Sequence, residues 1–81
     1  MRLPRDLSGE DLARALSAFG YSVTRQSGSH MRLTTEEHGE HHITIPRHAS
    51  VRVGTVAAIL ADVGAHFGLS RETIVERLFA R

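Results

Sequence analysis

The tripeptide Gly28-Ser29-His30 brings together residue types that could do chemistry, with Arg25 before it and Arg32 after it. Histidine is the side chain whose ordinary pKa, about 6.5, lets it give and take protons near neutral pH. Glycine lets a phosphate approach the backbone, a serine hydroxyl can donate to it, and arginines stabilise its charge. The combination suits proton-transfer chemistry on a phosphodiester. It equally suits a polar corner between two strands, so the pattern alone leaves both interpretations open.

A second candidate site combines Arg47-His48 with Gly54-Thr55, which opens a long apolar pattern. Free backbone amides and the dipole at a helix N-terminus can hold an anion. The alternative is that Thr55 only caps the helix. Both interpretations stay open at this point.

The histidines that follow the first candidate site lack the spacing of a metal centre. Neighbouring residues on a strand point to opposite faces, so His41 and His42 cannot share a ligand set. No helical His-x-x-x-His pair occurs. We therefore predict no metal site and interpret residues 36–40 as a solvated turn; the acids and histidines considered are Glu36, Glu37, His38, Glu40, His41, His42 and His48.

The elements that must position these residues can be predicted from periodicity. Ser8 precedes an apolar stripe of helical spacing that ends before Gly20, which predicts a helix over residues 9–19. Alternating runs predict strands over residues 21–26, 30–35 and 41–45, joined as an antiparallel meander. A second helix is expected from Thr55 to Gly68, and Ser70 precedes a third, short one over about residues 70–80.

Strand parity predicts one apolar and one polar face for the sheet. A single apolar face needs helices to cover it, whereas the polar face can meet water or a ligand. The expected fold is therefore α+β, with His30 on the open face beside Arg32 and close to His42 and Thr44. The apolar face should hold Tyr21, Val23, Met31, Leu33, Ile43 and Ile45, and the polar face Thr24, Gln26, His30, Arg32, Thr34, His42 and Thr44.

Length and composition limit the choices further. The chain has 81 residues, no cysteine and a net charge of +1, which fits one small domain with a core over about residues 7–68. Residues 21–35 and 41–61 contain arginines and histidines but no acid, which favours a nucleic-acid partner more than the net charge does. Because no signal peptide or long apolar run is present, we expect a soluble, cytoplasmic protein without membrane contact.

The combination of these motifs resembles the HicA family of toxin–antitoxin systems, small ribonucleases that cleave messenger RNA. The resemblance covers nearly the whole chain and leaves the third helix outside the minimal family domain. It rests on the Ser8-Gly9 helix start, Leu16 with Phe19-Gly20-Tyr21, the stretch Arg25-Gln26-Ser27-Gly28-Ser29-His30, Ile43-Thr44-Ile45-Pro46, His48, and Gly54-Thr55-Val56 with Ile59-Leu60.

The resemblance implies a double-stranded-RNA-binding-like α-β-β-β-α fold with both helices on one sheet face. It implies that His30 is catalytic, that a HicB-type antitoxin blocks the site, and that no metal or organic cofactor takes part. Two alternatives are a non-catalytic RNA-binding module of the same fold and a protein that acts only as half of a complex. Besides His30, the residues we expect to contact RNA are Arg25, Gly28, Ser29, Arg32, His42, Arg47, His48 and Thr55.

Overall fold

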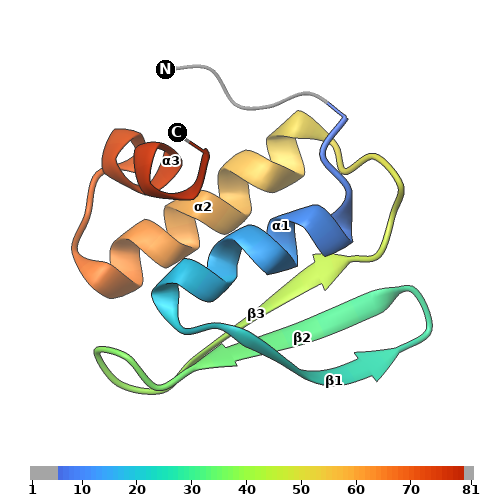
Figure 1. Ribbon diagram of the computed structural model, residues 1–81, viewed down its shortest axis with the longest axis horizontal. Coiled ribbons are helices and arrows are strands. Elements are labelled where there is room, and N and C mark those ends of the chain that lie inside the picture. Colours follow the sequence, from blue (N-terminus) through green and yellow to red (C-terminus); the bar gives the residue numbers. More distant parts are fainter. Residues whose placement is uncertain (1–5, 80–81) are drawn as a thin grey trace.

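The computed structural model describes residues 6–79. Residues 1–5, 80 and 81 lie outside the described residues, and residue 80 belongs to the predicted third helix. The elements follow the order α1 (Gly9–Leu16), the 3₁₀ turn η1 (Ser17–Phe19), β1 (Ser22–Ser27), β2 (His30–Thr35), β3 (His41–Pro46), α2 (Val53–Phe67) and α3 (Arg71–Phe79) (Figure 1).

The predicted α+β fold is confirmed. The three strands form one antiparallel sheet in the order β1-β2-β3, and the helices lie on one side of it (Figure 1). The opposite face, called here the outer face, is not covered by any described element (Figure 1). Within residues 6–79, no single helix has the length and apolar character to cross a membrane. Helices α2 and α3 have the required length and composition only when taken together, and they are bent by 106° relative to each other.

Local signals set the ends of α1 as predicted. The Ser8 hydroxyl accepts the backbone N–H of Asp11 at 2.9 Å, which satisfies one of the free amides of the first turn. Gly20 has a φ of +82°, the left-handed conformation that ends a helix and favours glycine. The chain then enters β1 at Ser22, one residue later than the alternation predicts.

The start of α2 differs from the prediction. The helix begins at Val53, two residues before Thr55, and Arg52 caps it without a side-chain hydrogen bond. Val51 is buried and donates its N–H to the Leu7 carbonyl at 2.7 Å, which fixes the chain just before the helix. The first hydrogen bond of the helix accordingly runs from the Val56 N–H to the Arg52 carbonyl, at 2.9 Å. Thr55 consequently lies inside the first turn and does not cap it.

The core lies between the sheet and the helices and receives apolar side chains from every helix and from β2 and β3. Strand β1 contributes none, because all six of its residues are exposed. Val23 is therefore 47% exposed, contrary to the prediction that it belongs to the buried set. Its strand is at the sheet edge, where no helix covers it fully. Fully buried side chains include Leu12, Leu16, Leu33, Ile45, Leu60, Val63 and Ile74.

Helix α3 is part of the same core. Ser70 caps it by accepting the Thr73 N–H at 3.2 Å, and Ile74 is fully buried. The loop before α3 packs closely on α2 at Gly64, where an added Cβ would lie 2.8 Å from the Leu69 carbonyl oxygen. A larger side chain at residue 64 would therefore push the loop that leads to α3 away from α2.

Candidate functional site

Gly28 and Ser29 form the two-residue turn between β1 and β2. Ser27 lies opposite His30, so the turn contains only the two residues between them. Gly28 has a φ of +57°, whereas Ser29 has no positive φ, which is the pattern of a type II′ turn. Glycine is required here for its conformation, and no heavy atom would lie within 4 Å of an added Cβ. The space above Gly28 is therefore open.

His30 is the first residue of β2 and is exposed. It lies opposite Pro46, while Arg32, two residues further on the same face, lies opposite Thr44. His30 and Arg32 therefore share the outer face, where parity predicted them. The residue directly opposite His30 on β3, Pro46, has no side-chain donor or acceptor.

A β-bulge in β1 brings Arg25 to the outer face as well. The register shifts between Val23 and Arg25, and Thr24 is the extra residue. As a result Arg25 lies directly opposite Arg32, and neither arginine forms a salt bridge within residues 6–79. Two guanidinium groups opposite each other on a sheet repel unless an anion lies between them.

The same bulge overturns the prediction for Gln26. Parity assigned Gln26 to the outer face with Thr24, but Gln26 lies opposite Met31, whose side chain is buried on the helix side. One inserted residue reverses the side of every residue that follows it in the strand. Gln26 therefore faces the side of the sheet that carries α1.

His42 is not a neighbour of His30, contrary to prediction. It lies opposite Thr34, and Thr34 is four residues from His30, about 13 Å along the strand. Its ring nitrogens contact the Thr34 hydroxyl and the Glu40 carboxylate, each at 2.7 Å. Thr44, opposite Arg32, occupies the position on β3 that is diagonal to His30 on the same face, as predicted. The register therefore separates His42, but not Thr44, from His30.

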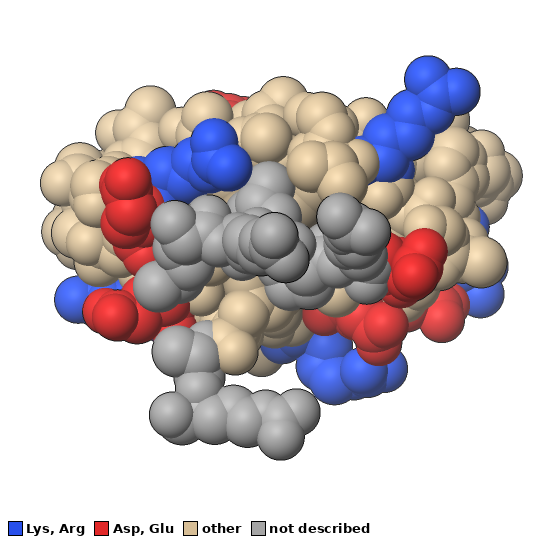
Figure 2. Space-filling view, turned by 90° about the horizontal axis from the view of Figure 1, so that it is seen from above, with Lys and Arg blue, Asp and Glu red and all other residues tan. Residues whose placement is uncertain are grey.

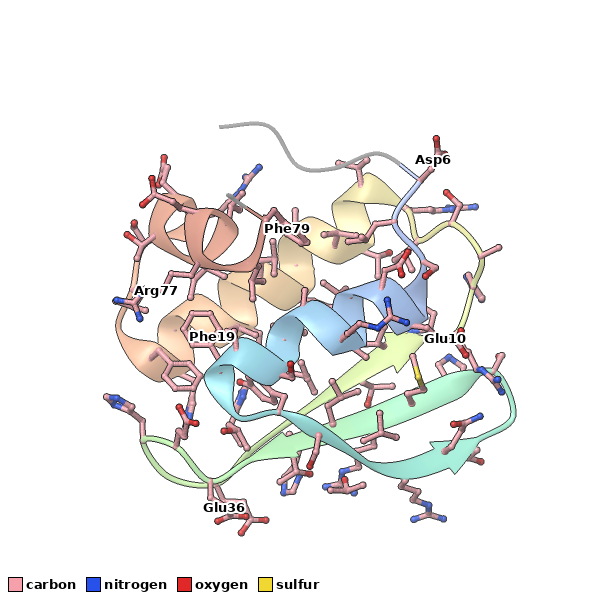
Figure 3. The ribbon with its side chains drawn as sticks, in the orientation of Figure 1. Asp6, Glu10, Phe19, Glu36, Arg77 and Phe79 are labelled. Carbon is pink, nitrogen blue, oxygen red and sulfur yellow. The ribbon has the colours of Figure 1, made fainter. Side chains whose placement is uncertain are left out.

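Arg47 lies at the same end of the sheet as the Gly28-Ser29 turn. Its backbone N–H donates to the Ser29 carbonyl at 2.6 Å, which joins the two candidate sites through the backbone. Its side chain is on the helix side, where Nε donates to the Glu10 carboxylate at 3.1 Å. Figure 3 shows Glu10 at the start of α1, above the end of β3. Arg47 is thus beside the turn but paired with an acid.

The start of α1 packs against the chain that follows β3. Gly9 donates its N–H to the His48 carbonyl at 2.9 Å, and a Cβ on Gly9 would overlap the Pro46 carbonyl oxygen. Sequence reasoning missed Glu10 and Gly9 here, because their partners lie almost forty positions away and no local pattern indicates them. Among the described residues, no side-chain hydrogen bond joins Thr55 or His48 to the turn.

Another set of side chains links β3 to α2 at the far end of the sheet. His41 contacts the Tyr21 hydroxyl at 2.7 Å and the Asp62 carboxylate at 3.2 Å, and its ring stacks on His66 at 4.4 Å. Burial, and then the negative charge of Asp62, raise the pKa of Tyr21 to about 12. His41 and His42 point to opposite faces, as predicted. Within residues 6–79, no three histidine, aspartate or glutamate side chains are grouped to hold a metal ion.

Charge is distributed differently on the two sides of the molecule. On the helix side, arginine and acidic side chains are interspersed (Figure 2). On the sheet, the unpaired Arg25 and Arg32 are near the Gly28-Ser29 turn, whereas Glu36 is at the opposite end (Figure 3). The cationic part of the outer face is therefore the part that carries His30.

Comparison with protein families shows which family the chain belongs to. The family model described as "HicA toxin of bacterial toxin-antitoxin" matches residues 9–65, which run from the first residue of α1 through most of α2. The chain belongs to the HicA toxin family. Comparisons with curated proteins and with solved structures give no match.

The part of the chain that matches the HicA family contains the whole sheet and the Gly28-Ser29-His30 turn. Helix α3, from Arg71 to Phe79, follows the matched range. HicA toxins belong to toxin–antitoxin pairs, so membership of the family implies a cognate antitoxin as a partner.

Proposed function

We propose that this HicA-family chain is an endoribonuclease that cuts messenger RNA on the outer face of its sheet, with His30 as the catalytic residue. The observation that carries the proposal is the group formed by His30, Arg25 and Arg32 on an exposed face. A proton-transfer group lies beside two guanidinium groups that have no acidic partner among the described residues. A phosphodiester would supply the negative charge that the two guanidinium groups lack as a partner.

The chemistry follows from these side chains. The 2′-hydroxyl of a nucleotide attacks the adjacent phosphorus, and the 5′-oxygen of the next nucleotide leaves. His30 takes the proton of the 2′-hydroxyl or gives one to the leaving oxygen, while Arg25 and Arg32 stabilise the charge that develops on the phosphorane oxygens. The products are a 2′,3′-cyclic phosphate and a 5′-hydroxyl. The second proton transfer falls to His48 or water, because the pair that contains His42 is four residue pairs from the pair that contains His30.

The proposed mechanism needs neither a metal ion nor an organic cofactor, because one imidazole and two guanidinium groups supply the proton transfer and the charge. Cleavage should therefore continue in EDTA. We further propose that the cognate antitoxin is of the HicB type and covers this face. The toxin would act in the cytoplasm, where messenger RNA is found, as part of a stress response.

The test compares wild-type protein with His30→Ala on a defined RNA. We expect the variant to cut about 10²- to 10⁴-fold more slowly, the usual effect of losing a proton-transfer group, with an unchanged unfolding midpoint. His38→Ala is the matched control, since His38 is an exposed histidine in the β2–β3 turn. An RNA with every 2′-hydroxyl methylated should stay intact. Full activity of His30→Ala, or cleavage of the methylated RNA, would refute the mechanism.

A non-catalytic RNA-binding module is the second candidate. It is favoured by one observation, the lack of a side-chain proton donor or acceptor on Pro46, the residue opposite His30. In that case wild-type protein would bind RNA and leave it full length after long incubation. His30→Ala would then weaken binding only modestly.

A further inference from the structure

An open groove runs between α1 and the edge strand β1, and the function proposed above does not use it. Its volume is about 460 Å³, within the range of about 300–1,000 Å³ typical of ligand sites. Ala13 of α1 and Val23 and Met31 of the hairpin form apolar walls. Arg14, Ser17 and Gln26 supply polar groups at its sides, together with Glu10, whose carboxylate is paired with Arg47. Val23 is 47% exposed because it borders this groove.

The groove adjoins the candidate catalytic turn. Gln26 and Met31 both line it, and they lie opposite each other one pair below Ser27 and His30. Gln26 faces the groove only because of the bulge at Thr24. Bulges are common beside active sites, where they redirect a side chain. The redirected side chain here is a primary amide, which can both donate and accept hydrogen bonds.

Arg14 is held at the groove by its own helix. Its Nη1 donates to the Asp11 carboxylate at 3.0 Å, and the pKa of Asp11 is lowered because Ser8 and Arg14 stabilise the carboxylate. The Ser17 hydroxyl donates to the Arg14 carbonyl at 2.6 Å, which leaves its oxygen free to accept. The Tyr21 hydroxyl is already bonded to His41, so only its ring is presented to the groove.

These features match the way proteins read single-stranded RNA. A base that is splayed out of its stack is held on a guanidinium plane or an apolar wall, and its edge is read by hydrogen bonds. An amide side chain is suited to such an edge, because its donor and acceptor lie side by side. Arg25 and Arg32 are the neighbours of Gln26 and Met31 in the two strands and face the opposite, outer side of the sheet. An RNA strand that passes over the edge strand β1 would place a base in the groove and its phosphates at these arginines.

We propose that this groove receives one base of the RNA next to the phosphate held at His30, and that Gln26 selects which base it is. The inference rests on the proposed function, because it assigns a specificity residue to that same site. It gives Gln26 a positioning and selection role. Proton transfer stays with His30.

The experiment maps cut sites in a pool of RNAs of random sequence. Wild-type protein should show a base preference at one position beside the cut. Gln26→Glu replaces the donor half of the amide by an acceptor, so the preferred base at that position should change, with a shift of about tenfold or more in relative cutting. Gln26→Ala should lose the preference. Glu76→Gln, the reverse exchange at an exposed residue of α3, is the matched control and should keep the wild-type pattern.

The outcomes separate this inference from the proposed function. If wild-type protein cuts and both Gln26 variants keep its base preference, the selection role of Gln26 is wrong while the nuclease remains. If wild-type protein does not cut, NMR of the methyl groups of Ala13 and Val23 with four single-base tetranucleotides decides the point. Methyl chemical-shift changes that depend on the base would support base binding in the groove. Shifts with the cognate antitoxin and none with RNA would assign the groove to a protein partner and overturn the inference.

Discussion

Arg25 lies directly opposite Arg32 in the β1–β2 ladder, because a bulge at Thr24 moves Arg25 to the outer face. Like charges in such a pair destabilise a sheet by roughly 0.2–1 kcal/mol. Neither guanidinium has an acidic partner within residues 6–79 that would offset the repulsion. An anion bound between the two guanidinium groups would relieve this repulsion, so the proposed phosphate site predicts opposite effects on folding and on binding.

We predict that Arg32→Gln stabilises the free protein and weakens RNA binding. Removing one charge should raise the free energy of unfolding by a few tenths of a kcal/mol up to about 1 kcal/mol. The slope of log affinity against log salt should fall in magnitude by about 0.7, the value for one phosphate contact on a single strand. Denaturant unfolding and fluorescence anisotropy with a short RNA, in a His30→Ala background that slows cutting, measure the two effects.

The control for RNA binding is Arg71→Gln, which removes an exposed arginine from the start of α3. It should leave the salt slope unchanged. If Arg32→Gln destabilised the protein and left the slope as in wild type, the arginine pair would not be a phosphate site.

We predict that Gly9→Ala destabilises the domain although alanine is the better helix former. The added methyl group would overlap the Pro46 carbonyl oxygen, so α1 must move away from the end of β3 or β3 must shift. Overpacking of this kind costs about 1–3 kcal/mol. The midpoint of denaturant unfolding measures it.

Gly54→Ala is the matched control, because Gly54 is in the first turn of α2 and a Cβ there would meet no atom within 4 Å. That change should be neutral or stabilise by up to about 1 kcal/mol. Equal effects of the two substitutions on the free energy of unfolding would show that the contact between Gly9 and Pro46 leaves room for a methyl group.

We predict a loss of stability at high pH that comes from Tyr21. Its pKa rises from 10.0 to about 12 on folding, through burial and the charge of Asp62. The folded state therefore favours the protonated phenol, and the stabilisation is present below pH 10 and is lost as the pH rises from 10 to 12. Tyr21 is the only tyrosine in the chain, so absorbance titration of tyrosinate reports on it alone.

Tyr21→Phe removes the titrating group and serves as the comparison. Its unfolding free energy should depend less on pH in this window than that of wild type. A tyrosinate titration of the native protein centred near pH 10 would contradict the prediction.

Alternation and capping signals were enough to predict most of the fold. The limits of β2 were predicted to the residue, β3 extends one residue further to Pro46, and α1 begins after Ser8. These elements succeed because their signals are local: a cap, a period of two or a period of 3.6, all set by neighbouring residues. The same local pattern placed His30 and Arg32 together on the open face.

The sequence alone therefore determined the order of the elements, the two faces of β2 and β3, and the position of His30 on the exposed one. Only the tertiary structure decided which side chains meet. Pairing register separates His42 from His30, a bulge reverses Gln26 and Arg25 in β1, and the packing of α1 gives Arg47 the partner Glu10. Register, bulges and long-range contacts depend on strands and helices distant in the chain, so no local period carries them.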